Sequence, residues 1–300
     1  MKRVSRGTPG GDAYLDLQNQ ARRTGRTTDE LLRLYILEGF LARLAAGDER
    51  ESLILKGGVL LAAFGIRRST RDVDLAALHL SNETVAVLDL VRTILATVPA
   101  ADDGIEFDLD SLTAQTIRDE DEYSGVRVGA TAHLASAVIS FHADVNVGDP
   151  IWPEPEHIHL PRLLGGADLE LVGYPLPMVH AEKIVTAIQR GTANTRWRDF
   201  GDIWALSRRY ALTSLDLQQA IGIVADHRNA VLGPLADILD GYADLAQPRW
   251  ARWRHRSSSD HLPEEFTLVL NDVVGFADPV LLRDVDRSVW DPASRSWQQS

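Results

Sequence analysis

The chain has 300 residues, 45% of them hydrophobic, which is enough to bury one large core or two medium ones. Its formal net charge of -12 argues against a protein that coats nucleic acid through bulk charge. It has no cysteine, which excludes disulfides and thiolate zinc sites and fits a reducing cytoplasm. We find neither a secretion signal nor an apolar run of the ~18 residues that span a membrane, so we expect a cytoplasmic protein without a membrane partner.

The first third of the chain alternates between helix and strand patterns. Residues 1–10 have the composition of a loose tail, and Thr27 with Glu30 three residues later has the pattern of a helix start. The elements predicted after this start are a helix over about 28–46, a strand at 53–55, a helix at 59–64, a strand at 72–78 and a helix at 80–98.

From residue 105 to 148 the pattern becomes that of β-strands. Alternating or β-branched segments occupy 105–109, 125–130 and 138–147, and 169–172 is predicted as a short edge strand. Prolines between 150 and 161 predict loops, and helical periodicity dominates beyond Pro177. The sequence therefore predicts an α/β half up to about residue 175 and a helical half after it.

Two carboxylates stand two residues apart in Asp72-Val73-Asp74. On a strand, both would project from one face while Val73 and Leu75 enter the core. Two like charges on one face repel each other unless a cation lies between them, and carboxylate oxygens suit Mg²⁺. A solvated acidic pair is the alternative interpretation, and it is favoured for such a motif in isolation.

The residues before this motif favour phosphate binding. The pair Gly57-Gly58 lets a phosphate approach the main chain, and a helix that begins near Val59 would direct free N–H groups at the anion. Separately, the glycines fit a tight turn and the arginines fit a solvated surface, but the ordered set favours a nucleotide site. The basic and hydroxyl side chains of the following loop, which suit phosphate, are Arg67, Arg68, Ser69, Thr70 and Arg71.

Asp144 lies in an otherwise apolar strand, where an unpaired carboxylate would be costly. If its strand neighbours that of Asp72 and Asp74, the three carboxylates form one cluster that can hold two metal ions. Asp144 can also act as the general base for an attacking hydroxyl. The alternative is an edge-strand carboxylate that faces water.

The segment from Arg249 to Arg256 interleaves basic residues with Trp250 and Trp253. Charge and aromatic stacking of this kind suit an RNA backbone and its exposed bases. The two tryptophans also have the spacing of one helical face, so an amphipathic helix with a tryptophan core and solvated arginines explains the segment equally well.

The segment from Leu55 to Leu75 resembles motif I of the AbiEii/AbiGii-type toxins, the nucleotidyltransferases of type IV toxin–antitoxin pairs that include the mycobacterial MenT group. The later segments 181–185 and 196–203 are similar to two further motifs of that family. The resemblance spans about residues 50–275. It implies a nucleotidyltransferase-type α/β domain with a mixed sheet and N-terminal helices over 1–175, followed by a mainly helical C-terminal domain over 176–300.

The resemblance also implies Mg²⁺, a nucleoside triphosphate substrate, an RNA acceptor such as the 3′ end of a tRNA, and a cognate antitoxin protein. Val59 stands where serine or threonine is usual, which removes one phosphate-binding hydroxyl. A small-molecule nucleotidyltransferase, or a non-catalytic binding protein on the same fold, remains consistent with these residues. Carried over by motif, the metal ligands are Asp72, Asp74 and Asp144, the other catalytic residues are Lys183 and Asp199, and Lys56 joins the glycine pair and the loop as nucleotide-binding.

Overall fold

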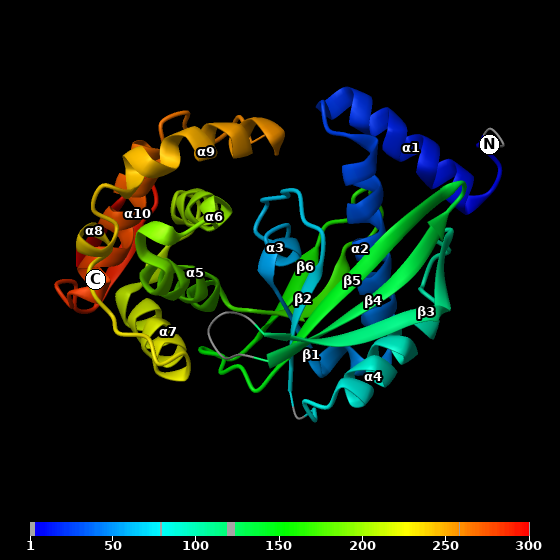
Figure 1. Cartoon of the computed structure of the whole chain (residues 1–300), viewed down its shortest axis with the longest axis horizontal. Helices are drawn as coiled ribbons and strands as arrows, with labels where there is room; N and C mark the ends of the chain where they lie inside the picture. The colour runs from blue at the N-terminus through cyan, green and yellow to red at the C-terminus, as the bar shows by residue number, and fades with distance from the viewer. Residues whose placement is uncertain (1–3, 79, 119–123, 258, 300) are drawn as a thin grey trace. The chain divides into compact units, whose positions relative to one another are not determined.

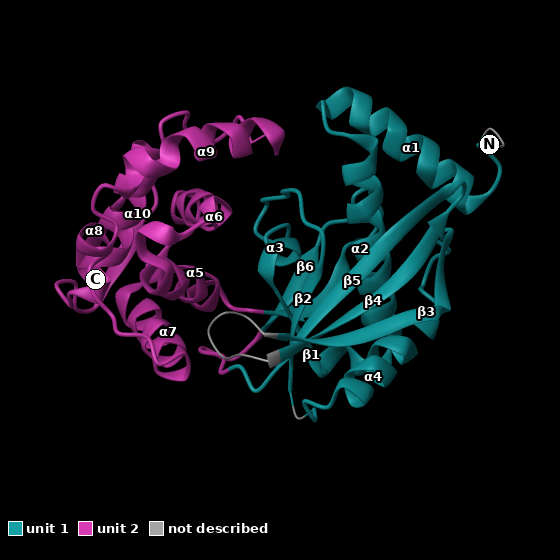
Figure 2. Cartoon of the chain, in the orientation of Figure 1, with its two compact units in different colours: residues 1–149, 156–173 teal, residues 150–155, 174–300 magenta. Residues whose placement is uncertain are grey.

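The computed structural model describes residues 4–78, 80–118, 124–257 and 259–299. The chain divides into two compact units, residues 1–149 with 156–173 (unit 1) and residues 150–155 with 174–300 (unit 2) (Figure 2). Unit 1 contains a mixed sheet with helices and unit 2 is mainly helical, which confirms the predicted fold class. No helix in the described ranges has the length and hydropathy needed to cross a bilayer.

The sheet of unit 1 has, in the described part of the chain, seven strands in the order β3-β4-β5-β2-β1-β7-β6 (Figure 1). The sheet is mixed because β2 pairs with β5 and β1 with β7 in parallel, whereas the other neighbours are antiparallel. The prediction of an edge strand at 169–172 is wrong in its placement, since β7 lies between β1 and β6. The strands are β1 Leu53–Lys56, β2 Val73–Ala77, β3 Ile105–Arg118, β4 Ser124–Leu134, β5 Ala137–Val147, β6 Glu156–Leu160 and β7 Leu169–Gly173.

The helices of unit 1 follow the predicted order with shifted boundaries. Helix α2 (Thr28–Ala46) matches the prediction, and the Thr27 side chain accepts a hydrogen bond from the Glu30 amide. Helix α1 (Pro9–Thr24) begins inside the predicted tail. Helix α3 is only Gly57–Leu60, because i→i−3 turns replace the predicted helix from residue 61 to 65. Helix α4 (Thr84–Ala96) is shorter than the predicted helix over 80–98, because it begins only after Glu83.

One face of the sheet packs against α2. The ring of Phe40 on α2 lies 5.0 Å from that of Phe141 on β5. Strand side chains alternate, so the odd-numbered residues of β5 face α2 and the even-numbered residues face the other way. Because Ala143 and Val145 pair in register with Val73 and Leu75 of β2, these residues belong to the α2 side, and all four are completely buried. The residues between them project from the opposite face.

Unit 2 is built around a cluster of aromatic side chains. Its helices are α5 Leu176–Arg190, α6 Trp197–Ser207, α7 Ser214–His227, α8 Leu235–Ile238, α9 Tyr242–Arg256 and α10 Phe266–Leu281. The rings of Phe200, Tyr242 and Trp250 each lie within 6 Å of Phe266. A small sheet that the helical pattern did not predict joins β8 Leu212–Thr213, β9 Ser288–Asp291 and β10 Ser296–Gln299.

Candidate active site

Four charged residues lie in register across four neighbouring strands of unit 1. Lys56 on β1 pairs with Asp74 on β2, Asp74 pairs with Asp144 on β5, and Asp144 pairs with Arg127 on β4. Directly paired residues project from the same face with Cβ atoms about 5 Å apart. The four residues, which we call the charged row, therefore lie side by side on the sheet face opposite to α2.

Asp72 joins the charged row from the end of β2. Its carboxylate Oδ2 lies 3.4 Å from Arg127 Nη2, and the same nitrogen lies 2.6 Å from Asp144 Oδ2. Asp74 is partly exposed, whereas Val73 and Leu75 are fully buried, so the predicted alternation of this segment is confirmed. Asp74 is thus the direct strand partner of Asp144, and Arg127 links Asp72 to Asp144, while the roles of the three aspartates as ligands stay a prediction.

Arg127 is the member of this site that sequence reasoning missed. Its Nε donates to Asp144 Oδ1 at 2.7 Å and its Nη2 donates to Asp144 Oδ2 at 2.6 Å, a two-point pair of the strong, charge-assisted kind. The hydrogen bond to Asp144, together with the nearby carboxylates, raises the pKa of Arg127 above its usual range. An available signal was the cation between Val126 and Val128, since a charge in an apolar strand requires a partner.

Gly57 makes room for Asp74. Its φ of +66° lies in the left-handed region that favours glycine, and a Cβ added at this position would lie 1.9 Å from Asp74 Oδ2. The carboxylate therefore rests against the main chain at the first residue of α3. Gly57 was predicted to let a phosphate approach the main chain, and in the structure the Asp74 carboxylate occupies the space beside it.

Gly58 has a similar relation to Thr70. A Cβ at residue 58 would lie 2.5 Å from Thr70 Oγ1 and 3.0 Å from Arg68 Nη1. Thr70 is 6% exposed, and within the described ranges its buried hydroxyl has no hydrogen-bond partner. Leaving such a group unsatisfied costs about 1 to 3 kcal/mol. An orphaned hydroxyl beside a glycine pair is what a phosphate-binding loop would present before its ligand arrives.

Lys56 is buried on β1 and ion-paired. Its Nζ lies 2.5 Å from Asp149 Oδ2, and its side chain is 9% exposed. Asp149 stands directly before Pro150, in the segment after β5. It places a compensating carboxylate on the ammonium group at the end of the charged row.

Arg67 is directed to a second buried carboxylate. Its Nη1 lies 3.6 Å from Glu38 Oε2, and its Nη2 donates to the carbonyl of Pro161. Burial raises the pKa of Glu38 and lowers the pKa of Arg67, each disfavouring the charged form. Arg67 thereby ties α2 to the segment after β6, whereas Ser69 and Arg71 of the same loop are exposed. Nucleotide binding by these three residues stays a prediction.

In unit 2, the predicted catalytic lysine forms a buried triad. Lys183 on α5 has its Nζ 2.8 Å from Asp202 Oδ2 and 3.2 Å from Asp199 Oδ1, both on α6. Arg196 Nε lies 3.7 Å from the other oxygen of Asp199. Lys183 is thus a shared partner of Asp199 and Asp202. The triad fixes the position of the ammonium group within unit 2.

Comparison with known proteins shows the family of this chain. Residues 39–294 match the model of a protein family described as "Nucleotidyl transferase AbiEii toxin, Type IV TA system", where TA denotes toxin–antitoxin. The chain belongs to this family. It is a nucleotidyltransferase toxin of a type IV toxin–antitoxin system, and its substrate class is a nucleoside triphosphate. No curated protein matches the sequence.

Two solved structures resemble this AbiEii-family chain. A crystal structure from H. pylori, provisionally described as a nucleotidyltransferase, has 13% sequence identity and a TM-score of 0.52, covering 87% of this chain and 99% of that one. JHP933 from Helicobacter pylori has 15% identity and a TM-score of 0.49, covering 86% of this chain and 95% of that one. At such low identity, the first likeness shows a shared fold.

The side chains at this site of the AbiEii-family toxin fit one divalent ion held by two carboxylates better than two ions held by three carboxylates. Among the described residues, no three His, Asp or Glu side chains are gathered to hold a metal. Both oxygens of Asp144 already accept hydrogen bonds from Arg127. Asp72 and Asp74 provide hard oxygen donors that suit Mg²⁺. The guanidinium between Asp72 and Asp144 shows that this part of the sheet favours a positive charge.

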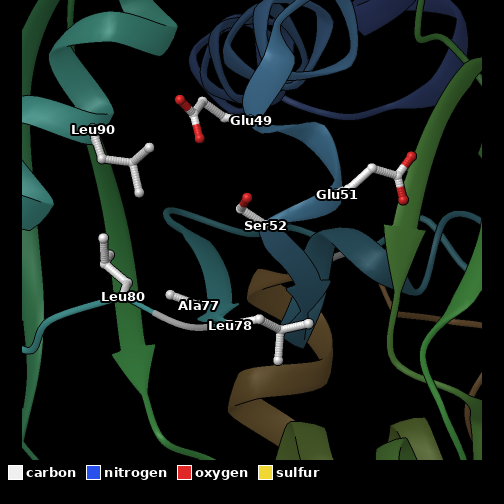
Figure 3. A pocket seen from close by; sticks show the side chains of 7 residues that line it. All are labelled: Glu49, Glu51, Ser52, Ala77, Leu78, Leu80 and Leu90. Carbon is white, nitrogen blue, oxygen red and sulfur yellow. The ribbon is translucent and has the colours of Figure 1, made fainter.

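Figure 3 shows a pocket of unit 1 that lies near the start of β1 and the end of β2. Its Ser52 and Ala77 flank the Leu53–Ala77 end of the strand pair, whereas Lys56 and Asp74 form the opposite end. None of the predicted site residues lines this pocket. The residues that line it are Glu49, Glu51, Ser52, Ala77, Leu78, Leu80 and Leu90.

Proposed function

We propose that this toxin transfers a nucleoside monophosphate from a nucleoside triphosphate to a hydroxyl of RNA, at the 3′ end of a tRNA, and that a cognate antitoxin opposes the resulting growth inhibition. The observation that carries the proposal is the charged row next to Gly57-Gly58. It combines carboxylates for a metal ion with a strand-to-helix turn, against which lies the hydroxyl of Thr70, without a hydrogen-bond partner among the described residues.

The reaction forms a bond from the acceptor oxygen to the α-phosphorus and breaks the bond from that phosphorus to pyrophosphate. The bonding electrons leave with pyrophosphate, and the hydroxyl proton passes to water or to a carboxylate of the site. Asp72 and Asp74 would hold Mg²⁺, which when bound supplies charge neutralisation at the phosphates. The rest of the catalysis is positioning and electrostatic stabilisation by the protein.

The remaining predicted residues have roles as triphosphate contacts. Thr70 and Ser69 offer hydroxyl donors, and Arg71 offers an exposed cation in the same loop. Lys56 contributes a positive charge at the end of the charged row. Lys183 is proposed as a point charge for the triphosphate, with Asp199 fixing its ammonium group.

An RNA acceptor is supported by the charge of α9. Arg249, Arg252 and Arg256 are exposed at a spacing that places them on one face of this helix, in a chain whose net charge is -12. Trp250 does not contribute to base stacking, because it is completely buried and its Nε1 donates to the Pro263 carbonyl. The amphipathic-helix interpretation is therefore correct for Trp250, and the arginine face is the part we propose for the RNA backbone.

The test is a transfer assay with each of the four α-³²P-labelled triphosphates and total RNA. We expect one or more triphosphates to label tRNA, and Asp74→Asn to reduce labelling at least about 100-fold. Asp89→Asn is the matched control, since it removes an exposed carboxylate on α4. Label in a small molecule would assign a different acceptor. No transfer by the wild-type protein with any triphosphate would refute the proposal and favour a binding protein.

The acceptor atom is tested with the same assay. Periodate oxidation destroys the terminal ribose diol of a tRNA and leaves the rest of the molecule intact. We expect oxidised tRNA to accept no label, because the attacking hydroxyl is gone. Equal labelling of oxidised and untreated tRNA would place the modification elsewhere in the RNA.

A further inference from the structure

The pair between Arg127 and Asp144 raises a question that the proposed transfer reaction leaves open. Asp144 is the third carboxylate in the charged row, yet both its oxygens accept from one guanidinium. Its side chain is 10% exposed, whereas that of Arg127 is 35% exposed. In this pair the carboxylate is nearly buried, whereas part of the guanidinium group remains accessible to solvent.

The strands hold Arg127 in this position. Arg127 and Asp144 are direct partners in the antiparallel β4–β5 ladder, and the residues on both sides of Arg127 are anchored in the core, with Val126 1% and Val128 0% exposed. The same Nη2 also reaches Asp72 Oδ2 at 3.4 Å. The guanidinium thus bridges the carboxylate expected to bind the metal and the carboxylate expected to complete the cluster.

We propose that Arg127 is a positioning residue that withholds Asp144 from the metal, so that the ion is held by Asp72 and Asp74 while the guanidinium supplies the positive charge of a second ion. This inference rests on the proposed function for the identity of the ligands. In this arrangement Asp144 acts through Arg127, neither as a metal ligand nor as the general base. The outer edge of the guanidinium is then directed to a phosphate, which it binds as a planar donor.

The decisive experiment measures metal binding by the full-length protein without nucleotide, by following the electron paramagnetic resonance signal of free Mn²⁺. Arg127→Gln removes the competing cation and releases Asp144 as an additional ligand. Because both effects favour a divalent cation, we expect Mn²⁺ to bind Arg127→Gln about tenfold more tightly than the wild type. Adding Asp144→Asn to this variant should abolish most of the gain.

Two further variants keep the result interpretable. Arg50→Gln removes one exposed positive charge elsewhere in unit 1 and should leave Mn²⁺ binding unchanged. Arg127→Lys keeps the charge but not the two-point geometry, so it should bind Mn²⁺ several-fold more tightly than the wild type. This variant decides the matter if Arg127→Gln does not fold in circular dichroism and thermal melts.

Folded Arg127 variants that bind Mn²⁺ no more tightly than the wild type would overturn the inference. The same holds if the double variant keeps the full gain, because Asp144 would then not be the released ligand. The readout does not depend on transfer. If the protein lacks transferase activity but its variants bind Mn²⁺ in the expected order of affinity, the proposed function is refuted while the proposed role of Arg127 is supported.

Discussion

Replacing Gly57 with alanine tests whether the position of Asp74 matters for transfer. The added Cβ would lie 1.9 Å from Asp74 Oδ2 and 2.5 Å from its Cγ, whereas real Cβ contacts essentially never fall below 3.0 Å. The carboxylate must therefore move by at least 3.0 − 1.9 = 1.1 Å. A displacement of about 1 Å in a catalytic group costs on the order of 100-fold in rate.

The same substitution also lowers the stability of the fold. Alanine at a φ of +66° costs about 1 to 2 kcal/mol in backbone strain. Rotation of the side chain does not move Asp74 Cβ, which would lie 2.7 Å from the added Cβ, so the main chain must shift as well, and this adds about 1 to 3 kcal/mol. We expect Gly57→Ala to lower the free energy of unfolding by about 2 to 5 kcal/mol and the transfer rate about 100-fold.

The assay compares tRNA labelling with urea unfolding for matched glycine variants. Gly25 ends α1 at a φ of +71°, and an added Cβ there would meet no atom within 4 Å. Gly25→Ala should therefore show the backbone strain of about 1 to 2 kcal/mol without loss of transfer. Transfer by Gly57→Ala within about threefold of the wild type would refute the reasoning, because the carboxylate would then tolerate the displacement.

Three further predictions concern buried polar groups. Thr70→Val removes a hydroxyl without a partner among the described residues. The free energy of unfolding in urea should therefore stay equal or rise by about 1 kcal/mol, while KM for the triphosphate increases several-fold. A loss of stability with unchanged KM would contradict this prediction. Lys183→Met leaves the two aspartates of the triad buried without their cation, so it should lower the free energy of unfolding by about 3 kcal/mol. Replacing both aspartates with asparagine in this variant should restore the lost stability. Burial lowers the pKa of His180 from 6.5 to about 3, so the neutral form stabilises the fold above pH 6.5. That contribution falls as the pH drops, by about 2 to 3 kcal/mol at pH 4.5, and a His180→Gln variant whose unfolding keeps the full acid dependence would show that other groups cause it.

Local patterns predicted the elements of unit 1 well where capping and periodicity agree. Helix α2 matches its prediction because Thr27 caps it and its apolar residues recur at helical spacing. Helix α1 was missed because Pro9-Gly10-Gly11 has poor helix propensity, although Thr8 caps it and proline suits the first turn. The small sheet of unit 2 was missed because β8, β9 and β10 have at most four residues each, too few for a clear alternation.

The site was predictable in its residues but not in its pairings. An acid in an apolar strand pointed to Asp144, and the parallel pairing of β5 with β2 places it directly beside Asp74. Its partner Arg127 depends on the register of β4 against β5, which is fixed by long-range packing and is not visible in local sequence. The partners of Lys56 and Lys183 were missed because they lie on other segments, 93 residues away for Lys56 and 16 and 19 residues away for Lys183, and local sequence does not show how such segments pack.

The measurement that tests the central claim most directly follows the two ends of one triphosphate. Parallel reactions contain the wild-type toxin, tRNA and the preferred triphosphate labelled with ³²P at either the α or the γ phosphate. The account predicts that the α label enters the tRNA, that the γ label is released as pyrophosphate, and that Asp74→Asn abolishes both. Entry of the γ label into the tRNA, or α-label transfer that persists in Asp74→Asn, would contradict it.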